Sequence, residues 1–452
     1  MNISIPNDVQ LIIDTFYNNG YKAFMVGGCV RDSILSCNPK DYDITTSALP
    51  EETINLFNKT VPTGIKHGTI TVLINDESYE VTTFRSDGEY NDNRRPDSVT
   101  FVRNIKDDLS RRDFTINALA YNKKEGLMDY FNGLNDLENK IIKCVGDPDK
   151  RFNEDALRML RAIRFSCQLD FQIDYPTYNS IRKNYKLINN ISSERIRDEL
   201  CKILISNNPS KGLELLKDTG ILQIILPEIY ELIEYTPNCN NHNRDVFKHT
   251  LKVIDNTENN LLLRLAALFH DVGKLNTMTL LENGHCYFPG HSCESATMTK
   301  KILSRLSFDN LTIKRVCSII NEHLVLNVKY LPTDGEIKRL INKVGSKNMN
   351  LLFSLQRADT KALWDPQPFL DKIDFMEYRV NLILERNEPL TVKDLAINGK
   401  TIVEKLKLKP GKIIGEILNY LLNEVLDDSC LNNEDILLNK SKSYLESKNP
   451  SH

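Results

Sequence analysis

The chain has 452 residues, of which 41% are hydrophobic and 26% charged, and its formal net charge at pH 7 is −3. This length predicts two to four compact units, and this composition excludes a fibrous or wholly disordered chain. A charge so close to neutral excludes a globally basic nucleic-acid-binding protein, so any contact with a polynucleotide must come from local basic surface.

No segment of the sequence indicates a membrane span, a signal peptide or a zinc ribbon. No stretch approaches the ~18 uninterrupted apolar residues that cross a bilayer. Met1 to Gln10 has no basic region followed by an apolar stretch, and the ten cysteines include no Cys-x-x-Cys pair. We therefore expect a cytoplasmic protein, and nothing in the sequence indicates its oligomeric state.

The first 145 residues carry strand patterns and predict an α/β domain. Runs rich in Val, Ile, Thr and aromatic residues alternate with Gly, Asn and Asp turns. The predicted strands are Ala23 to Val26, Tyr42 to Thr45, Thr69 to Ile74, Tyr79 to Phe84 and Val99 to Val102, with helices near Val9 to Asn18 and Asn117 to Tyr121. From Asn153 onward the apolar residues follow a helical period, so the rest is predicted to be mainly helical.

Breaks in the helical part divide it further. The polar, Asn-rich stretch Thr236 to Arg244 is typical of a linker, and a second break lies near Trp364 to Gln367. The turn Lys409 to Lys412 separates two helical patterns near the C-terminus. We expect a head at residues 1–145, a helical neck at 146–236, a histidine-containing block at 245–362 and a helical tail at 368–445.

The first motif lies where the strand Ala23 to Val26 meets Gly27-Gly28-Cys29-Val30-Arg31-Asp32 and a helix-compatible segment. Two glycines at such a junction let the backbone approach a phosphate closely. Arg31 could add a bidentate donor. Taken alone, a Gly-Gly turn before a helix is more often only a turn.

A pair of acids follows ten residues later. Asp41 and Asp43 stand two residues apart in a predicted strand, so both side chains should project from one face about 6 to 7 Å apart. Like charges that close are costly unless a cation neutralises them, which suggests a pair of Mg²⁺ ions for phosphoryl transfer. A solvated strand end with incidental acids is the alternative. Glu80, in a neighbouring strand pattern, could supply a third carboxylate.

The stretch Asp108 to Ala120 combines two arginines, an acid and an Asn at the entry to an apolar segment. Arginines such as Arg112 suit contacts with phosphate or ribose there. A capped surface helix with Asp113 near its start explains the same residues equally well.

A third motif lies in the stretch Glu154 to Arg164. Asp155 and Arg158 are three residues apart and should be neighbours on one helical face, with Arg161 and Arg164 continuing that ridge. Cytosine and adenine both place an exocyclic amine beside a ring-nitrogen acceptor, which an Asp beside an Arg complements; uracil and guanine invert that order. The pair could therefore select C and A without a template. An exposed i, i+3 ion pair is the alternative.

Together these motifs resemble the class II tRNA nucleotidyltransferases of the polymerase-β-type superfamily, which includes bacterial poly(A) polymerases. The matching stretches are Gly27 to Asp32, Asp41 to Thr46, Glu80 to Arg85, Arg111 to Ala120 and Glu154 to Phe165. The resemblance implies a polymerase-β-like mixed sheet and template-independent addition or repair of the 3′-terminal CCA of tRNA from CTP and ATP. It further implies that the neck completes the nucleotide pocket and that the tail grips tRNA. Cys29 departs from the small residue usual at its position.

The resemblance also implies roles for individual residues. These are triphosphate binding by Gly28 and Arg31, catalysis and Mg²⁺ binding by Asp41 and Asp43, nucleotide binding by Arg112, and recognition of the base edge by Asp155 and Arg158, with Arg161 and Arg164 beside them. Arg85 to Pro96 resembles the family's flexible loop for adding the terminal A, which disfavours an enzyme restricted to CC. A poly(A) polymerase or an A-adding enzyme is the alternative within this chemistry.

The block at 245–362 holds most of the eight histidines. Imidazole and carboxylate ligands suit a hydrolytic site for a divalent metal. The order of these residues resembles the HD phosphohydrolases, which implies an Mn²⁺, Ni²⁺ or Mg²⁺ site. Its implied ligands are His249, His270, Asp271 and Asp359, with His291 and His323 able to support a second metal.

An active HD site would remove 2′,3′-cyclic phosphates or phosphates from damaged RNA ends. Two alternatives remain open for this block. The HD domain could be kept only for its helical scaffold. Conversely, the chain could be an HD phosphohydrolase whose N-terminal half only binds RNA.

Overall fold

The computed structural model describes residues 3–88, 98–233, 245–283, 285–324, 332–363 and 366–448. The chain divides into two compact units, Met1–Tyr230 and Glu231–His452. A search of the described residues for a helix of the length and apolarity that a bilayer crossing requires finds none.

The first unit opens on a seven-stranded mixed sheet with the strand order β3-β4-β5-β2-β1-β8-β9. Among the described strands of this sheet, β2 and β5 pair in parallel and the other neighbours pair antiparallel. The strands are β1 (Ala23–Val26), β2 (Ile44–Thr46), β3 (Thr60–Gly64), β4 (Thr69–Ile74), β5 (Glu77–Thr83), β8 (Leu119–Asn122) and β9 (Gly126–Asp129), with a separate pair, β6 (Arg85–Asp87) and β7 (Val99–Phe101). The mixed sheet predicted for the head is confirmed.

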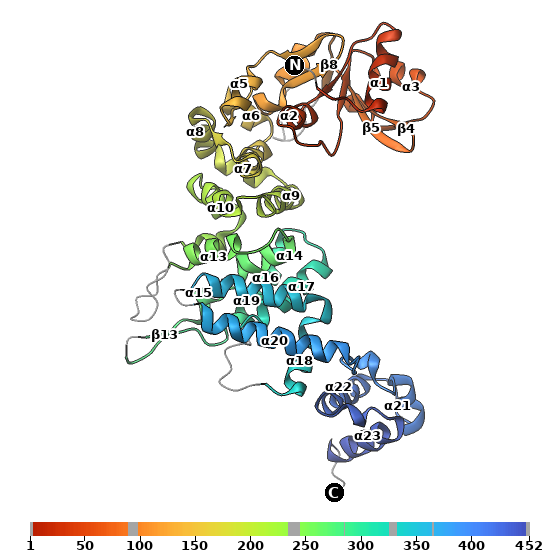
Figure 1. Cartoon of the computed structure of the whole chain (residues 1–452), viewed down its shortest axis with the longest axis vertical. Helices are drawn as coiled ribbons and strands as arrows, with labels where there is room; N and C mark the ends of the chain where they lie inside the picture. The colour runs from red at the N-terminus through yellow and green to blue at the C-terminus, as the bar shows by residue number, and fades with distance from the viewer. Residues whose placement is uncertain are drawn as a thin grey trace. The chain divides into compact units, whose positions relative to one another are not determined.

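Helix α1 (Asn7–Asn18) covers one face of the sheet, where it contacts β1 (Figure 1). Its buried residues Val9, Ile12, Ile13 and Phe16 recur at helical spacing, which is why this segment forms an amphipathic helix. All four residues of β1 are buried, as expected for a central strand covered on both faces. This rigid strand ends directly before Gly27.

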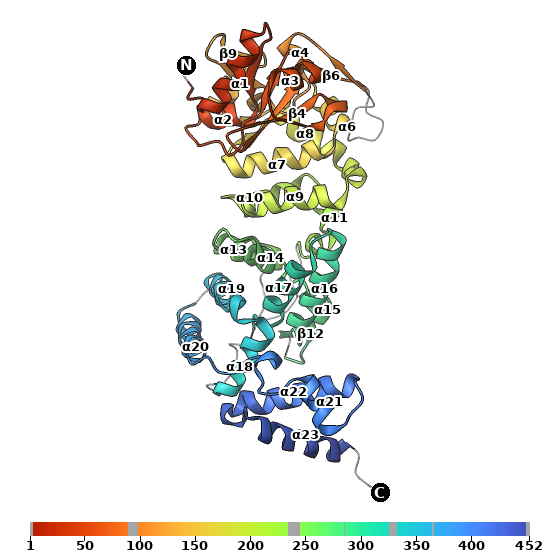
Figure 2. The ribbon, with the colours of Figure 1, turned by 90° about the vertical axis from the view of Figure 1, so that its right-hand side faces the viewer.

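Short helices connect the strands of the sheet, and further helices come after the last strand of the sheet in the chain. They are α2 (Gly28–Ile34), α3 (Pro50–Leu56), α4 (Ile105–Ser110), α5 (Gly133–Glu138), α6 (Pro148–Glu154), α7 (Leu157–Leu169), α8 (Tyr175–Asn184), α9 (Ser193–Leu204), α10 (Pro209–Asp218), α11 (Leu222–Ile225) and α12 (Pro227–Tyr230), with the small pair β10 (Ile141–Ile142) and β11 (Gln172–Ile173). In both views α7 lies beside α9 and α10 (Figures 1 and 2). Ten of the thirteen α7 residues are buried, so this helix is central to the unit.

Two predictions for the head are wrong in detail. The segment predicted as a helix from Asn117 is a 3-10 turn over Thr115–Asn117 followed by strand β8. Pairing of β8 with β1 and β9 overrides the local helical preference of its Leu and Ala residues. Strand β2 begins only at Ile44, so Asp41 and Asp43 precede the strand rather than lying in it.

The second unit is almost entirely helical. Its elements are α13 (Val246–Asp255), α14 (Leu261–Phe269), α15 (Lys274–Thr277), β12 (Thr279–Leu280), β13 (Cys286–Tyr287), α16 (His291–Arg305), α17 (Asn310–Asn321), α18 (Asp334–Val344), α19 (Met349–Lys361), α20 (Gln367–Glu385), α21 (Gly399–Leu406), α22 (Lys412–Asp427) and α23 (Glu434–Lys448). Helix α14 is buried from Leu263 to Phe269 and contacts α13, α16, α17 and α19, because a helix that is apolar on all sides must be enclosed.

The C-terminal helices α21, α22 and α23 form a core of their own around Ile402, Ile417, Leu421 and Leu437. The predicted turn Lys409 to Lys412 lies between α21 and α22. The predicted linker Thr236 to Arg244 falls outside the described residues, and so do Trp364 and Asp365 of the second predicted break.

Candidate active sites in the two units

The two acids of the head, Asp41 and Asp43, are exposed and lie immediately before β2. The backbone holds this segment, because the Asp43 carbonyl accepts a hydrogen bond of 3.0 Å from the amide of Val26. Surrounding protein atoms partly desolvate the Asp43 carboxylate and raise its pKa; Arg112 opposes this rise and Asp41 adds to it. Two mutually repelling carboxylates in reach of solvent suit a divalent cation.

The glycine turn lies beside these acids. Gly27 has a φ of +78°, which L side chains rarely adopt, and a Cβ there would meet Nη1 of Arg112 at 2.9 Å. Arg31 is 8% exposed and donates from Nη1 to Oδ1 of Asn117 at 2.7 Å. The absence of a side chain at Gly27 therefore lets one guanidinium pack directly against the turn.

Three guanidinium groups surround the ring of Phe165 on α7. The Cζ atoms of Arg31, Arg161 and Arg164 lie 5.0, 5.4 and 4.2 Å from the ring centroid. The negative face of an aromatic ring offsets part of the repulsion between cations held this close. The cluster joins α2 of the sheet region to α7, and each of its guanidinium groups is also paired with a carboxylate, that of Asp32, Asp113 or Glu199.

Asp108 is an essential part of this site that the sequence analysis missed as an individual residue. Its carboxylate has no exposed surface and accepts hydrogen bonds from Nε and Nη2 of Arg111 at 3.1 and 2.9 Å. Oδ2 of Asp108 is 3.7 Å from Nη2 of Arg112 and accepts from the hydroxyl of Thr45 at 3.4 Å. One buried acid thus ties both arginines to strand β2, and the i, i+3 and i, i+4 spacing was the available signal.

The structure corrects the expected geometry of Asp155 and Arg158. Helix α6 ends at Glu154 and α7 begins at Leu157, so Asp155 has an extended conformation between them and the two side chains do not share a helical face. Asp155 instead accepts from Nη2 of Arg195 at 2.8 Å. Arg158 donates to Oε2 of Glu154 at 2.6 Å. The two residues remain adjacent through a hydrogen bond of 3.0 Å from the amide of Arg158 to the carbonyl of Asp155.

Arg161 and Arg164 each bind a buried acid that local spacing did not reveal. Nε of Arg161 donates to Oδ2 of Asp113 at 2.7 Å, and Nη1 of Arg164 donates to Oε1 of Glu199 at 3.1 Å. Burial opposes ionisation of Asp113, but Arg161 outweighs it and holds the pKa of Asp113 at about 2. These ion pairs fix α7 against the sheet region and against α9.

Glu80 lies one residue before Val81, and Val81 pairs with Ile44 in the parallel ladder of β5 and β2. Asp43 likewise lies one residue before Ile44, so both acids come directly before the first paired residues of this ladder. Glu80 is exposed.

A cavity of about 750 Å³ opens beside the end of β6. Its lining includes Ser86, Asp87, Arg111, Lys150, Arg151 and Glu154. The predicted loop Arg85 to Pro96 starts here, and its residues 89–96 lie outside the described residues. The cavity therefore joins the start of this loop to α6, which leads into Asp155.

The second unit brings together all six histidine and aspartate residues predicted for an HD site. Nε2 of His249 lies 3.0 Å from Oδ1 of Asp359, and Nε2 of His270 lies 3.2 Å from Oδ2 of Asp271. They form two adjoining groups whose ligand atoms lie within 4.8 Å of one another: His249, His270 and Asp359 in one, and Asp271, His291 and His323 in the other. The interatomic distances within and between these groups suit one or two metal ions.

Three of the histidines are oriented for metal binding. Nδ1 of His270, His291 and His323 lies 2.8, 2.9 and 2.6 Å from the backbone carbonyls of Ala267, Phe288 and Ile320. A carbonyl only accepts, so each Nδ1 carries the proton and each Nε2 presents a lone pair. All three Nε2 atoms are buried without a hydrogen-bond partner. Burial also lowers the pKa of His323 to about 4, which keeps that ring neutral at pH 7.

Four family models match successive parts of the chain. They are the poly A polymerase head domain at residues 23–143, the probable RNA and SrmB-binding site of polymerase A at 170–232, the HD domain at 240–359 and the putative tRNA nucleotidyltransferase domain 2 at 371–440. The first contains Asp41, Asp43 and Arg112, and the third contains the six HD residues.

Known proteins match over nearly the full length. A CCA-adding enzyme of Ligilactobacillus salivarius is 35% identical over 98% of this chain and 99% of its own length, and one of Pediococcus pentosaceus is 35% identical over 96% of both. The crystal structure of the Bacillus stearothermophilus CCA-adding enzyme in complex with CTP is 27% identical, with a TM-score of 0.67 over 98% of each chain.

Proposed function

This chain belongs to the CCA-adding enzymes, which are tRNA nucleotidyltransferases, and on that premise we propose which of its residues carry out the addition of CCA to tRNA. The observation that carries the proposal is the convergence of Asp41 and Asp43 with Gly27 and Arg112 at the end of β1. Full-length relatives that are all CCA-adding enzymes do not favour a poly(A) polymerase or an A-adding enzyme.

Asp41 and Asp43 hold the catalytic metal, for which we propose Mg²⁺. Their exposure, their mutual repulsion and their oxygen ligands fit a hard divalent cation. When bound, Mg²⁺ lowers the pKa of the attacking 3′-hydroxyl and neutralises the triphosphate. Glu80, which like Asp43 comes directly before the first paired residues of the ladder of β5 and β2, is the third carboxylate of this site.

Gly28, Arg31 and Arg112 bind the triphosphate of the incoming CTP or ATP. The side-chain-free turn lets the phosphates approach the backbone, and the guanidinium groups of Arg31 and Arg112 flank that turn. Arg161 and Arg164 contribute positive charge from α7 through the cluster around Phe165. In the reaction the 3′-oxygen of tRNA attacks the α-phosphorus, the bond to the β-phosphate oxygen breaks, and pyrophosphate leaves.

Asp155 and Arg158 select the base. Their backbone hydrogen bond keeps them adjacent, and an Asp acceptor beside an Arg donor matches the edge that cytosine and adenine share. Arg195 and Glu154 occupy these two groups without a nucleotide, so the base has to displace them. Glu154 and Arg195 therefore keep the selecting pair satisfied between turnovers.

The tRNA substrate is bound by the neck, residues 146–236, and by the tail, residues 368–445. The match of residues 170–232 to an RNA-binding model and of 371–440 to a tRNA nucleotidyltransferase model supports this division. A tRNA substrate also favours a cytoplasmic location.

One assay tests the head activity directly. Purified protein with Mg²⁺ and a tRNA lacking CCA is incubated with CTP, with ATP, and with both, and the products are sequenced. We expect CC from CTP alone and CCA from both nucleotides. Long A tails, or A added only to tRNA that already ends in CC, would contradict CCA addition.

A second activity, metal-dependent phosphohydrolysis of RNA ends, is favoured by the HD site. Three buried Nε2 atoms without partners, beside the carboxylates of Asp271 and Asp359, fit a transition metal or Mg²⁺, and we propose Mn²⁺, Ni²⁺ or Mg²⁺. A metal bound there generates hydroxide from water at neutral pH. Water adds to phosphorus, the bond to the ribose oxygen breaks, and that oxygen takes a proton.

Release of 2′-phosphate or opening of a 2′,3′-cyclic phosphate on a short RNA tests this second activity. We expect it to need a divalent metal and to disappear in His270→Ala and Asp271→Ala protein. Hydrolysis that survives both substitutions would rule out the HD site as its source.

A further inference from the structure

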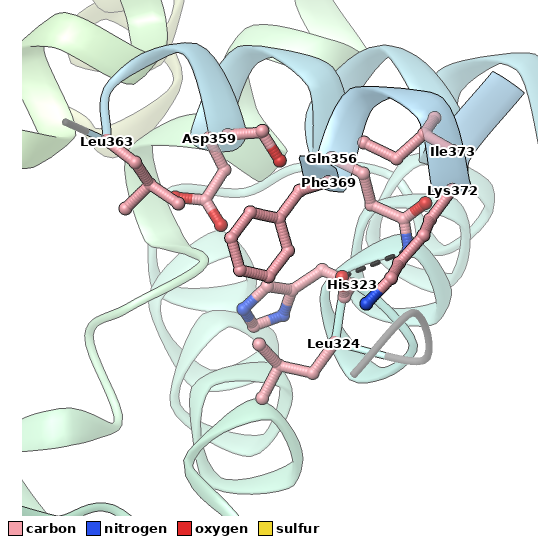
Figure 3. Close-up of a pocket in the computed structure, with 9 residues that line it drawn as sticks. His323, Leu324, Gln356, Asp359, Leu363, Phe369, Lys372 and Ile373 are labelled. Atoms are coloured by element: carbon pink, nitrogen blue, oxygen red, sulfur yellow. Dashed lines mark hydrogen bonds between the residues drawn. The ribbon is translucent and has the colours of Figure 1, made fainter. Parts of the chain in front are cut away.

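A small cavity of about 110 Å³ lies directly beside the HD site (Figure 3). Two of the predicted metal ligands, His323 and Asp359, form part of its wall. The remaining lining residues are Leu324, Gln356, Thr360, Leu363, Phe369, Lys372 and Ile373. Any molecule that fills this cavity therefore touches the HD site itself.

Helix α20 completes the cavity, although it follows the segment that matches the HD model. That match ends at residue 359, whereas Phe369, Lys372 and Ile373 all come from α20. Arg357, on the α19 helix that also carries Asp359, holds α20 in place: its Nη2 donates to Oδ1 of Asp374 at 2.7 Å and also binds Glu377. The wall of the cavity is thus fixed relative to the metal ligands.

The lining combines three kinds of group. Phe369 is 41% exposed, and Nζ of Lys372 lies 5.5 Å from the centroid of its ring. Lys372 forms no ion pair with any residue that the structure describes. Gln356 is 4% exposed and donates from Nε2 to the His323 carbonyl at 3.0 Å, as the dashed line in Figure 3 shows. Oε1 of Gln356 is buried and has no hydrogen-bond partner.

Each of these three side chains, Gln356, Phe369 and Lys372, favours a particular kind of ligand group. An unpartnered buried acceptor such as Oε1 of Gln356 is costly unless a ligand donates an N–H or O–H to it. A partly exposed aromatic ring suits contact with a base or with the apolar face of a sugar, and a lysine without an ion pair suits a phosphate. A water needs about 10 to 15 Å³ of such space, so the cavity holds roughly eight non-hydrogen atoms, the size of one ribose or one pyrimidine.

We propose that this cavity binds the base of the terminal nucleotide at the RNA end whose phosphate the HD site removes. Phe369 contacts the ring of the base, Oε1 of Gln356 accepts a hydrogen bond from the base, and Lys372 neutralises the phosphate. Helix α20 therefore determines the substrate preference of the hydrolase. This inference rests on the proposed HD activity, and it adds a recognition site that the metal ligands alone do not provide.

Phosphate release from cytidine 2′-monophosphate and from glycerol 2-phosphate, which has no ring, tests the cavity in the full-length protein. We expect Phe369→Ala to raise KM for the nucleotide about tenfold and to leave glycerol 2-phosphate unchanged, because only the nucleotide loses stacking. Lys372→Ala should raise KM for both. Phe375→Ala is the matched control, since Phe375 lies on the same helix with a similar exposure of 40% and does not line the cavity.

A binding measurement separates this inference from the hydrolytic activity. Isothermal titration calorimetry measures binding of cytidine 2′-monophosphate in metal-free buffer, where no phosphate is released. We expect saturable binding, with a dissociation constant about tenfold higher in Phe369→Ala protein than in Phe375→Ala protein.

Equal dissociation constants and equal KM values in the Phe369→Ala and Phe375→Ala proteins would overturn the base-binding cavity. Saturable binding that Phe369→Ala weakens, without any phosphate release, would instead overturn the HD activity and leave the cavity as a nucleotide-binding site.

Discussion

The two sites of this chain treat their acidic groups in opposite ways. In the first unit Asp41 and Asp43 are exposed, and the arginines around them are tied to buried acids such as Asp108. In the second unit His270 and Asp271 are 1% and 2% exposed, and Nε2 of His270 lies 3.2 Å from Oδ2 of Asp271 without a hydrogen bond. On the roles that we propose, the first site is therefore stable before a nucleotide and a metal bind, whereas the buried ring nitrogens of the second gain a partner when a metal binds.

The largest effect should come from the head carboxylates. If Asp43 holds the metal as we propose, Asp43→Ala removes one of its oxygen ligands, and we expect tRNA-primed incorporation of CTP to fall by about a thousandfold or more. HD hydrolysis should not change, because the HD residues lie in the other compact unit. Glu51→Ala, at another exposed acid in this unit, serves as the control. Incorporation near the level of the control would remove Asp43 from the catalytic site.

The next largest effect concerns metal retention at the HD site. We expect wild-type protein to keep divalent metal through dialysis against metal-free buffer, and His270→Ala to lower metal affinity by about a hundredfold. Elemental analysis gives the metal-to-protein ratio, and CCA addition should stay within about twofold. His285→Ala replaces an exposed histidine of the same unit and should retain the metal. If wild-type protein loses its metal as readily as His270→Ala protein, the contrast between the two sites is wrong.

A smaller effect should follow from Gly27→Ala. The new Cβ would lie 2.9 Å from Nη1 of Arg112, so the guanidinium has to move away from the turn, and we expect kcat/KM for CTP to fall about tenfold. Gly20→Ala is the matched control, because Gly20 has a φ of +83° but nothing within 4 Å of the added atom. Gly27 also has a ψ of −130°, outside the left-handed region that L residues adopt, so Gly27→Ala carries a larger backbone cost, and thermal unfolding of both variants measures that difference. An equal loss in both would show that Arg112 does not depend on the open turn.

The smallest effect is a pH dependence of stability. Arg161 holds the pKa of Asp113 at about 2 despite burial, below the unfolded value of about 3.9, so Asp113 stabilises the fold above about pH 4 and loses this contribution as the pH falls toward 2. Asp113→Asn should cost about 2 kcal/mol at pH 7 and progressively less in acid. Thermal unfolding of both proteins across this range measures it. A constant difference would show that ionisation of Asp113 is not responsible.

The motifs of the head could be read from the sequence because they are local. Gly27 and Gly28 mark a tight turn after an apolar strand, and the position of Asp41 and Asp43 relative to Arg112 follows the family order. Strand β1 has its predicted bounds, since a short run of apolar and aromatic residues between turns leaves few alternatives. The helix expected from Asn117 failed because the neighbouring strands, which lie far away in sequence, decide the conformation of β8.

The partners of the charged residues could not be read in the same way. Spacing alone suggested that Asp155 and Arg158 face each other, yet a break between α6 and α7 separates them and Arg195, forty residues later, binds Asp155. Arg161 and Asp113 are 48 residues apart. Whether residues this far apart in sequence form an ion pair depends on how the helices pack. The i, i+3 spacing rule applies within one helix and cannot predict such a pair.

By itself, the sequence provided the residue types and their order: two glycines, two acids and several arginines in the head, and an ordered set of His and Asp residues in the HD block. Only the tertiary structure decided how those groups are held. It oriented His270, His291 and His323 through backbone carbonyls, and it placed Phe369 and Lys372 of α20 beside the HD ligands. The sequence gives the identity of each side chain. Which buried atoms lack a hydrogen-bond partner depends instead on how segments distant in sequence pack together.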